Sequence, residues 1–238
     1  MWIQAAVAAI LLSVGFALIP MAAFLTIPET LTGLYLNPAD PRAPQIVALA
    51  EQYQALTYLD EIHSAGVYGE RGLGYAEQLG LLDKITIIQG GFGKSYGAAG
   101  GYIAAPRSVV EAVRSWAPAF VFSTSSPAPV VAAALASFKY NLEHDTQRKH
   151  LLAIVDHLKT GLRAAGIPLV SADSHILPLL VGDPHRNKHI SKVLLDEHDI
   201  YVQPVNAPTV PAGSERLRVT PTSAHSHADV ETFLAALG

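Results

Sequence analysis

The sequence contains no cysteine and few charged side chains. Of its 238 residues, none is Cys and only 15% are Asp, Glu, Lys or Arg. The lack of thiols excludes disulfides, cysteine nucleophiles and cysteine metal sites, and it is compatible with a cytoplasmic protein. The formal net charge is −4 and no basic cluster with interleaved aromatics is present, so we expect no nucleic-acid partner. The composition indicates a globular chain of one sizeable domain or two small ones.

Charge is missing altogether from residues 1–28, which carry no Asp, Glu, Lys or Arg. A bilayer core takes about 20 apolar residues, so this stretch is long enough to cross one. It has neither the basic start nor the cleavage site of a signal peptide, and Pro20 would kink or end a helix there. Two interpretations stay open: membrane contact by residues 1–28, or a buried apolar helix.

Beyond the proline-rich segment 37–44, short apolar runs alternate with longer helical patterns, which is typical of an α/β fold. The expected strands are 56–60, 85–88, 100–106, 167–170, 176–182, 200–205 and 217–221. The expected helices are 46–55, a segment from Ser108 with that residue as N-cap, 127–144, 147–165, 186–198 and 227–237. The long helices predict a boundary between two lobes near 125–145.

A glycine-rich turn around Lys94 follows the strand predicted at 85–88, in the stretch TIIQGGFGKSYGAAGGYIA. A phosphate-binding loop with Gly-Lys-Ser would need glycine at position 88, which is Ile, so that motif is excluded. Lys94 is then a point charge, a solvated surface group or a nucleophile.

Ionisable groups follow two successive predicted strands: Asp60 and His63 after the first, and Lys94 after the second. Such strand ends are where α/β sheets present ligands. A buried carboxylate, an imidazole and a lysine are what pyridoxal phosphate requires for its pyridine nitrogen, its ring hydroxyl and its aldehyde. Taken singly, Lys94 fits a surface charge, Asp60 a turn or helix cap, and His63 a core residue.

Four segments in this order resemble the 5-aminolevulinate synthases: TYLDEIHSAGVYGERGLGYAE, IIQGGFGKSYGAAGGYIAA, AFVFSTSSPAP and VNAPTVPAGSERLRVTPT. These belong to the α-oxoamine synthase group of fold-type I pyridoxal phosphate enzymes, and the resemblance runs from about residue 44 to 238. It implies an acyltransferase of heme and porphyrin biosynthesis that condenses glycine with succinyl-coenzyme A and works as a homodimer. Residues 44–126 would be part of the cofactor-binding large domain, with an incomplete sheet, and 127–238 a connecting helix and the small α/β domain.

The resemblance also implies roles for individual residues. Asp60 would contact the pyridinium nitrogen and His63 the ring hydroxyl, while Lys94 would form the Schiff base and transfer protons. The remaining implied residues are Ser123 and Thr124 on the cofactor phosphate across a dimer interface, Arg218 on the glycine carboxylate and Thr209 in a lid over the substrate. No metal is implied.

The sequence departs from the family pattern at Gly91 and Ala207, where the family usually has threonine and tyrosine. The family's N-terminal half, which supplies a histidine stacked on the cofactor, has no counterpart before residue 44. Residues 1–50 instead resemble a segment of multidrug and toxin extrusion transporters, notably in LTGLYLNPADPRAPQIVALA, so that 1–43 is predicted to be an apolar helical segment and linker. The alternative function is therefore a non-catalytic or membrane-associated fusion remnant.

Overall fold

The computed structural model describes residues 43–171 and 173–238. The segment predicted to contact a membrane and most of the transporter-like segment lie outside these residues, so both remain predictions. In the described part of the chain, no helix combines the length and apolar character needed to span a bilayer. The described helices longer than one turn are α3 (Ala43–Gln52), α5 (Arg107–Trp116), α7 (Ala128–Glu143), α8 (Thr146–Ala164), α9 (Pro184–His198) and α10 (His227–Leu237).

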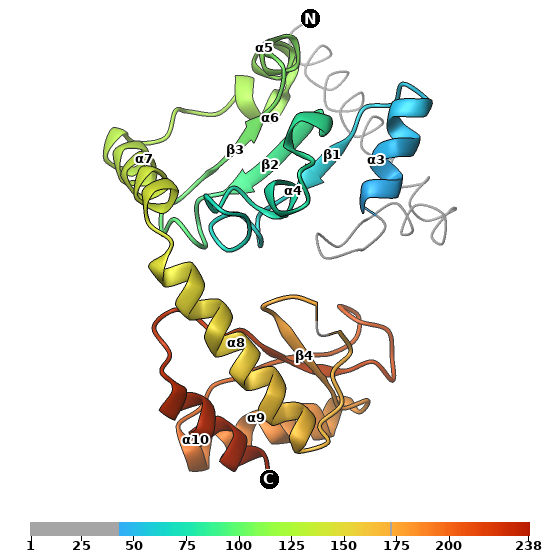
Figure 1. The fold of residues 1–238 in the computed structure, drawn as a ribbon, viewed down its shortest axis with the longest axis vertical. Helices are drawn as coiled ribbons and strands as arrows, with labels where there is room; N and C mark the ends of the chain where they lie inside the picture. The colour runs from blue at the N-terminus through green and yellow to red at the C-terminus, as the bar shows by residue number, and fades with distance from the viewer. Residues whose placement is uncertain (1–42, 172) are drawn as a thin grey trace, which may run out of the picture. The chain divides into compact units, whose positions relative to one another are not determined.

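The first sheet has the strand order β1-β2-β3 (Figure 1). Strand β1 (Tyr58–Asp60) runs parallel to β2 (Ile87–Gly91), and β2 pairs antiparallel with β3 (Gly101–Ala104). The short helices α4 (Tyr75–Gln78) and η1 (Leu82–Lys84) lie in the connection between β1 and β2, and α6 (Pro118–Val121) follows α5. Because β1 and β2 are parallel, their carboxyl ends lie at the same edge of the sheet.

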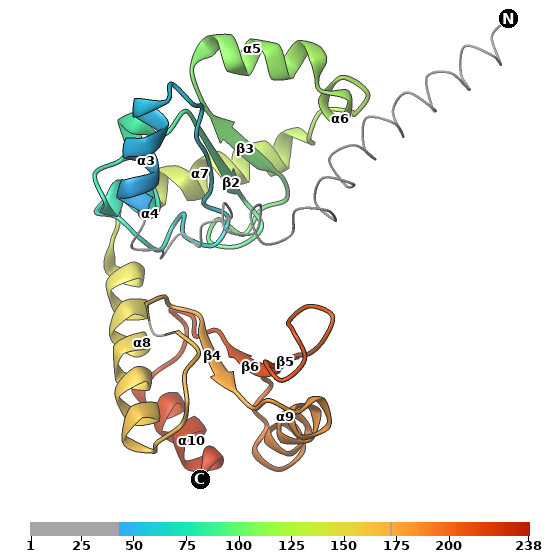
Figure 2. The same cartoon turned by 90° about the vertical axis from the view of Figure 1, so that its right-hand side faces the viewer.

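The second sheet is antiparallel, with the order β4-β6-β5 (Figure 2). It contains β4 (Leu177–Leu180), β5 (Gln203–Val205) and β6 (Arg216–Val219). Helix α8 packs beside α10, while α9 contacts β5 and β6. Strand β6 alternates, with Leu217 and Val219 buried and Arg216 and Arg218 partly exposed, so one face joins the core and the other carries arginines.

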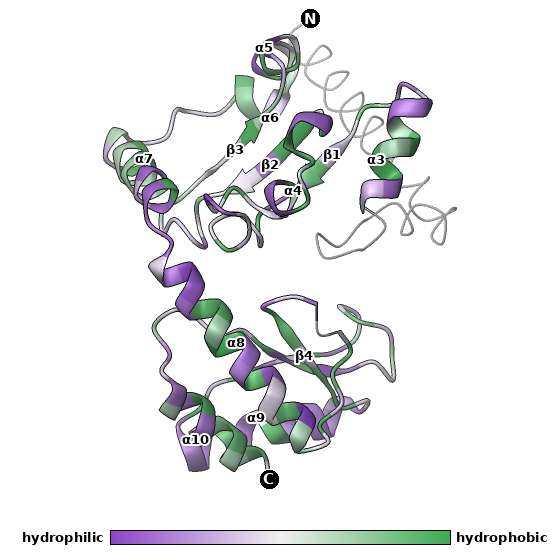
Figure 3. Cartoon of the chain, viewed as in Figure 1, coloured by the Kyte–Doolittle hydropathy of each residue, from purple (hydrophilic) through white to green (hydrophobic). Residues whose placement is uncertain are grey.

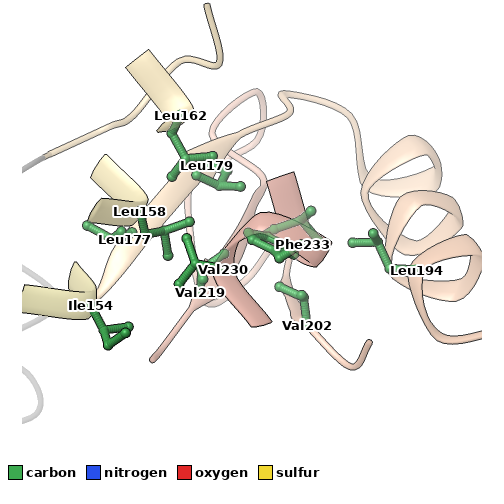
Figure 4. Close-up of a cluster of buried hydrophobic side chains, with 11 residues drawn as sticks. Ile154, Leu158, Leu162, Leu177, Leu179, Leu194, Val202, Val219, Val230 and Phe233 are labelled. Atoms are coloured by element: carbon green, nitrogen blue, oxygen red, sulfur yellow. The ribbon is translucent and has the colours of Figure 1, made fainter. Parts of the chain in front are cut away.

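The main hydrophobic core lies in this second region. Figure 4 shows Leu158 and Leu162 of α8 directed toward Leu177 and Leu179 of β4. Leu158 and Leu162 are four residues apart and so lie on one face of α8. Figure 3 shows hydrophobic and hydrophilic residues alternating along this helix. Phe233 of α10 belongs to the same cluster. The core therefore joins both helices to the strand pair β4–β6.

The predicted α/β class is confirmed, and most predicted elements are present within a few residues. The strand predicted at 167–170 is wrong, since only a single bridge joins Leu169 to Leu179. Pro168 and Pro178 flank this bridge and have no N–H to extend the pairing. Ser108 is not a helix cap either: α5 already begins at Arg107, with Pro106 at the N-cap position, so Ser108 lies inside the first turn. The predicted second strand starts at Ile87 and includes the glycines as far as Gly91.

Candidate active site

The shared edge of β1 and β2 brings Asp60 and the Lys94 turn to the same end of the first sheet. Asp60, the last residue of β1, lies opposite Gln89 of β2, and Lys94 follows the end of β2 by three residues. The Asp60 Oδ1 accepts a hydrogen bond from the Ile62 N–H at 2.9 Å, which turns the chain away from the strand. The predicted convergence of the two strand ends is thus present.

A tight loop holds Lys94 between β2 and β3. The Phe92 N–H donates to the Gly100 carbonyl at 2.9 Å, the Ala98 N–H donates to the Phe92 carbonyl at 2.9 Å, and the Gly97 N–H donates to the Lys94 carbonyl at 3.3 Å. Buried Tyr96 packs edge-on against Phe92, with ring centroids 5.9 Å apart. The backbone of the turn is fixed in this way while the Lys94 side chain stays exposed.

A close contact joins this turn to the loop that follows β1. The Ser95 hydroxyl donates to the Ala65 carbonyl at 2.7 Å. Gly66 has φ of +83°, and a Cβ placed there would lie 2.3 Å from the Ser95 Cβ, so only glycine allows this approach. Because His63 lies in the same loop, the contact fixes the loop of His63 against the turn of Lys94.

His63 has cationic neighbours from both sheets. Burial, together with the positive charges of Lys94 and Arg218, lowers the pKa of His63, while Asp60 opposes the shift. An Arg218 Nη2 lies 3.5 Å from the His63 Nδ1. Asp60, His63, Lys94 and Arg218 therefore form one group, hereafter the Lys94 cluster, in which cations outnumber carboxylates and which is suited to an anionic ligand.

The prediction that Asp60 is buried is wrong: its side chain is exposed, and the fully buried carboxylate is its neighbour Glu61, with 0% of its surface exposed. Glu61 accepts hydrogen bonds from the Tyr75 N–H at 2.9 Å, the Ala76 N–H at 2.7 Å and the Ser64 hydroxyl. Successive side chains of an extended segment point to opposite sides, so only one of two adjacent carboxylates can face the interior. That alternation was the signal that could have identified Glu61.

Within the part of the chain that the structure describes, the side chains of Ser123 and Thr124 are not hydrogen-bonded to the Lys94 cluster. Both are exposed after α6, and the Ser123 hydroxyl donates to the Phe120 carbonyl at 3.1 Å. No hydrogen bond recorded for residues 43–171 and 173–238 joins either side chain to the Lys94 turn.

Thr209 is also exposed, in the turn after β5, where its N–H donates to the Asn206 carbonyl at 3.0 Å. Asn187 of α9, which is fully buried, donates to the Asn206 Oδ1 at 2.7 Å and so anchors the start of that turn. Among the hydrogen bonds of residues 43–171 and 173–238, none joins Thr209 to the Lys94 cluster.

Sequence reasoning missed a contact beside the cluster between buried His175 and half-buried Tyr68. The His175 N–H donates to the Tyr68 hydroxyl at 2.8 Å, and that hydroxyl lies 3.0 Å from the His175 Nδ1. Tyr68 follows His63 in the same loop and His175 precedes β4. Their sequence separation left no periodic signal, so only the fold brings them together.

The α/β fold and the Lys94 cluster agree with what comparison with known protein families shows. The family model of the aminotransferases of class I and II matches residues 26–237, and the chain belongs to this family. That match includes residues 26–43 and so overlaps the segment compared above with transporters.

Particular relatives are the 5-aminolevulinate synthases. The chain is 44% identical to the 5-aminolevulinate synthase of Bradyrhizobium diazoefficiens over 193 residues, which are 81% of this chain and 47% of the relative. It is 47% identical to 5-aminolevulinate synthase 1 of Cereibacter sphaeroides over 197 residues, which are 82% of this chain and 48% of the relative. The chain thus spans about half the length of the curated relatives it matches.

A solved structure of serine palmitoyltransferase from S. paucimobilis, with a bound PLP–myriocin aldimine, superposes with a TM-score of 0.77. It is 31% identical, and the match covers 82% of this chain and 49% of that one. The predicted fold, the C-terminal part of a pyridoxal phosphate transferase, is therefore confirmed.

Proposed function

We propose that this chain carries the lysine-bearing and carboxylate-binding part of a 5-aminolevulinate synthase-type acyltransferase that uses pyridoxal phosphate. The observation that carries the proposal is the Lys94 cluster, in which two parallel strand ends and an arginine of the second sheet meet around His63. The names of the relatives support the reaction, the condensation of glycine with succinyl-coenzyme A to 5-aminolevulinate, coenzyme A and carbon dioxide.

The residues of the cluster fit the ring side of the cofactor. Asp60 offers an exposed carboxylate to a pyridinium N–H, and Lys94 offers an exposed amine to the aldehyde. His63 is the group suited to a hydrogen bond with the ring hydroxyl, and its lowered pKa keeps the imidazole neutral near pH 7. When bound, the cofactor supplies an electron-withdrawing ring for the α-carbon of an amino acid. With the cofactor bound, the amine of Lys94 would be the group that accepts the α-proton of the amino acid.

Arg218 is the residue for the substrate carboxylate. Its guanidinium is planar and permanently charged, so it binds a carboxylate through two parallel hydrogen bonds. It extends from the partly exposed face of β6, and its Nη2 lies 3.5 Å from the His63 Nδ1, which supports a carboxylate site near the proposed cofactor ring. Thr209, in the turn anchored by Asn187, is assigned to the segment that covers the substrate.

We assign Ser123 and Thr124 to the phosphate of a cofactor bound in a second copy of the chain. The residues just before them are exposed and apolar: Trp116 is 84% exposed and Phe122 is 88% exposed. Exposed aromatic patches mark protein interfaces, and aromatic residues are enriched in their cores. A homodimer through this patch would bury these rings. It would also explain why, among the described residues, neither Ser123 nor Thr124 is hydrogen-bonded to the Lys94 cluster of its own chain.

A second candidate function is a non-catalytic remnant of such an enzyme. The exposure of Asp60, His63 and Lys94 favours it, because ionic interactions in a water-filled site are weaker than in an enclosed one. The two candidates differ in whether the Lys94 cluster binds the cofactor at all.

The test is the visible absorption of the purified full chain after addition of pyridoxal phosphate and removal of the excess. We expect a band from cofactor attached to Lys94 that is lost in Lys94→Ala. The control is Lys139→Ala, which removes an exposed lysine of α7 and should leave the band unchanged. No band in the parent, or equal loss in both variants, would contradict the proposal and favour the remnant. If the band is present, glycine-dependent release of coenzyme A from succinyl-coenzyme A is then measured.

A further inference from the structure

Tyr68 and His175 form a two-point contact between loops that are far apart in the sequence. The His175 backbone N–H donates to the Tyr68 hydroxyl at 2.8 Å, and the hydroxyl lies 3.0 Å from the His175 Nδ1. The two rings also meet edge-to-face, with centroids 5.4 Å apart and planes at 63°. His175 is buried and Tyr68 is half-buried, so both contacts are largely shielded from water.

The hydrogens of this contact can be assigned by counting donors. The Tyr68 oxygen already accepts the backbone N–H of His175, and its single proton is then free to bond to Nδ1. Nδ1 is the acceptor in this arrangement, so the imidazole is neutral and carries its proton on Nε2. Burial, assisted by the charges of His63, Arg218 and Lys159, lowers the pKa of His175 to about 4, in agreement with a neutral ring.

Tyr68 belongs to the loop that carries His63, and His175 leads into the strand that pairs with the strand of Arg218. Tyr68 lies in the loop of His63, where its N–H donates to the Ser64 carbonyl and its carbonyl accepts from the Gly74 N–H, each at 3.0 Å. His175 leads into β4, whose Pro178 lies opposite Arg218 of β6. By comparison, the direct contact of Arg218 with His63, at 3.5 Å, is at the outer limit of a hydrogen bond.

We propose that the Tyr68–His175 contact positions Arg218 against His63 and Lys94, and so sets the site at which the amino-acid carboxylate binds. The proposal rests on the function proposed above, which assigns the carboxylate to Arg218. Both residues are positioning residues: they hold the two segments together and touch neither cofactor nor substrate.

The neutrality of the pair matters for this role. A carboxylate in place of His175 would pair with Arg218 and compete with the substrate for its charge. The neutral pair links the two segments and does not neutralise Arg218. Among the ion pairs of residues 43–171 and 173–238, none joins the Arg218 guanidinium to a carboxylate. The contact therefore sets the position of Arg218 without neutralising the charge of its guanidinium.

The experiment compares three variants with the parent. Tyr68→Phe removes only the hydroxyl and keeps the ring. His175→Leu removes the imidazole, while His175→Asn keeps an acceptor oxygen near the position of Nδ1 and should rescue the contact. His189→Asn, an exposed histidine of α9, is the matched control. Far-ultraviolet circular dichroism verifies that each variant is folded.

The first measurement is the glycine concentration that gives half of the spectral change in the cofactor-loaded chain. Loss of one hydrogen bond corresponds to about a three- to tenfold weaker affinity. We expect this increase in Tyr68→Phe and His175→Leu with the Lys94-dependent absorbance retained, and parent-like values in His175→Asn and His189→Asn. Parent-like glycine binding in Tyr68→Phe, or loss of the absorbance itself, would overturn the positioning role.

The second measurement uses the cofactor-free chain and does not depend on the proposed function. The imidazole pKa of His63 is followed by nuclear magnetic resonance, and it should rise in Tyr68→Phe and His175→Leu because Arg218 no longer lies beside it. Groups that remain next to His63 in every variant are Lys94 and Asp60. An unchanged pKa in both variants contradicts the proposal. A shifted pKa in a chain that never develops the Lys94-dependent absorbance supports the positioning contact and refutes the proposed function alone.

Discussion

The two sheets of this chain differ in how completely they are covered. Eleven residues, from α8, α9, α10 and the strands around them, form the buried cluster beside the sheet β4–β6–β5. The other cluster contains Val67, Leu151 and Val155, and two of these three belong to α8. In the first sheet, β1 has a single partly buried residue, and both end residues of β3 are exposed.

We infer from this difference that the second sheet contributes most of the stability, whereas the first sheet carries most of the candidate site residues. The second sheet supplies most of the apolar burial that stabilises the fold, at about 25 cal/mol per Å². The first sheet supplies the edge with Asp60 and Lys94, and it depends on polar contacts such as that of Ser95 with Ala65 to hold its loops in place. We therefore expect core substitutions and loop substitutions to affect different properties.

The largest effect on stability is expected in the second sheet. Leu177→Ala, at a side chain with 0% exposure, should lower the free energy of unfolding by about 2–5 kcal/mol, because it leaves a cavity in a packed cluster. Leu56→Ala, at a side chain with 76% exposure just before β1, should change it by no more than about 0.5 kcal/mol. Urea unfolding of both variants measures this contrast, and similar losses would mean that the two regions are equally packed.

The adjacent carboxylates Asp60 and Glu61 should separate stability from binding. Glu61→Ala leaves the N–H groups of Tyr75 and Ala76 without their acceptor, so we expect a loss of about 2–4 kcal/mol. Asp60→Ala removes one exposed bond to Ile62 and should cost about 1 kcal/mol or less, yet it should abolish cofactor binding. Urea unfolding and the cofactor absorbance distinguish the two; a stable Glu61→Ala would contradict the structural role of Glu61.

Two glycine substitutions test the contact between the His63 loop and the Lys94 turn. Gly66 and Gly80 both have positive φ, of +83° and +67°, so alanine costs about 1 kcal/mol at either position. A Cβ at Gly66 also collides with Ser95, whereas nothing lies within 4 Å of a Cβ at Gly80. Gly66→Ala should therefore be about 1–3 kcal/mol less stable than Gly80→Ala and lose the cofactor absorbance. Equal effects would exclude the collision as the cause.

The smallest expected effect is a pH dependence from His175. Because burial lowers its pKa from 6.5 to about 4, the unfolded chain binds this proton more readily than the folded chain between these values. The contribution of neutral His175 to the free energy of unfolding is therefore complete above pH 6.5 and is lost as the pH falls toward 4. From pH 7 to pH 5 the parent should lose about 1–2 kcal/mol more than His175→Asn, as measured by urea unfolding. An identical pH dependence would mean that His175 titrates normally in the folded chain.

Hydrophobic periodicity and the alternation of short strand patterns with longer helical patterns were enough to predict the α/β class and the elements around Asp60 and Lys94. The helices at 127–144 and 147–165 lie within a residue or two of α7 and α8, because apolar positions repeat at helical spacing over a long stretch. The strand at 167–170 could not be excluded in this way, since only the pairing partner reveals that two prolines face the same bridge.

The positions of the candidate site residues could be predicted where they follow strands, and not where they depend on tertiary contacts. The sequence places Asp60, His63 and Lys94 after two strands, and the structure brings their loops together through Ser95. Glu61 rather than Asp60 is buried because the N-terminus of α4 donates hydrogen bonds to it. Tyr68 and His175 are 107 residues apart in the sequence, so their contact depends on the tertiary fold. The roles assigned to the Lys94 cluster, to Ser123, Thr124 and Thr209, and the domain boundaries remain predictions.

Buried Arg148 limits how this protein can be dissected into fragments. Its guanidinium donates to the carbonyls of Asn141 at 2.6 Å, His144 at 3.0 Å and Glu70 at 2.7 Å, and no carboxylate neutralises it in the recorded ion pairs of the described residues. A fragment that begins at Asp145, between α7 and α8, would lose all three acceptors and carry an unsatisfied interior cation. A fragment that begins before Ala128 keeps two of them. Expression boundaries for the C-terminal region therefore belong upstream of α7, however natural the break between the two helices looks.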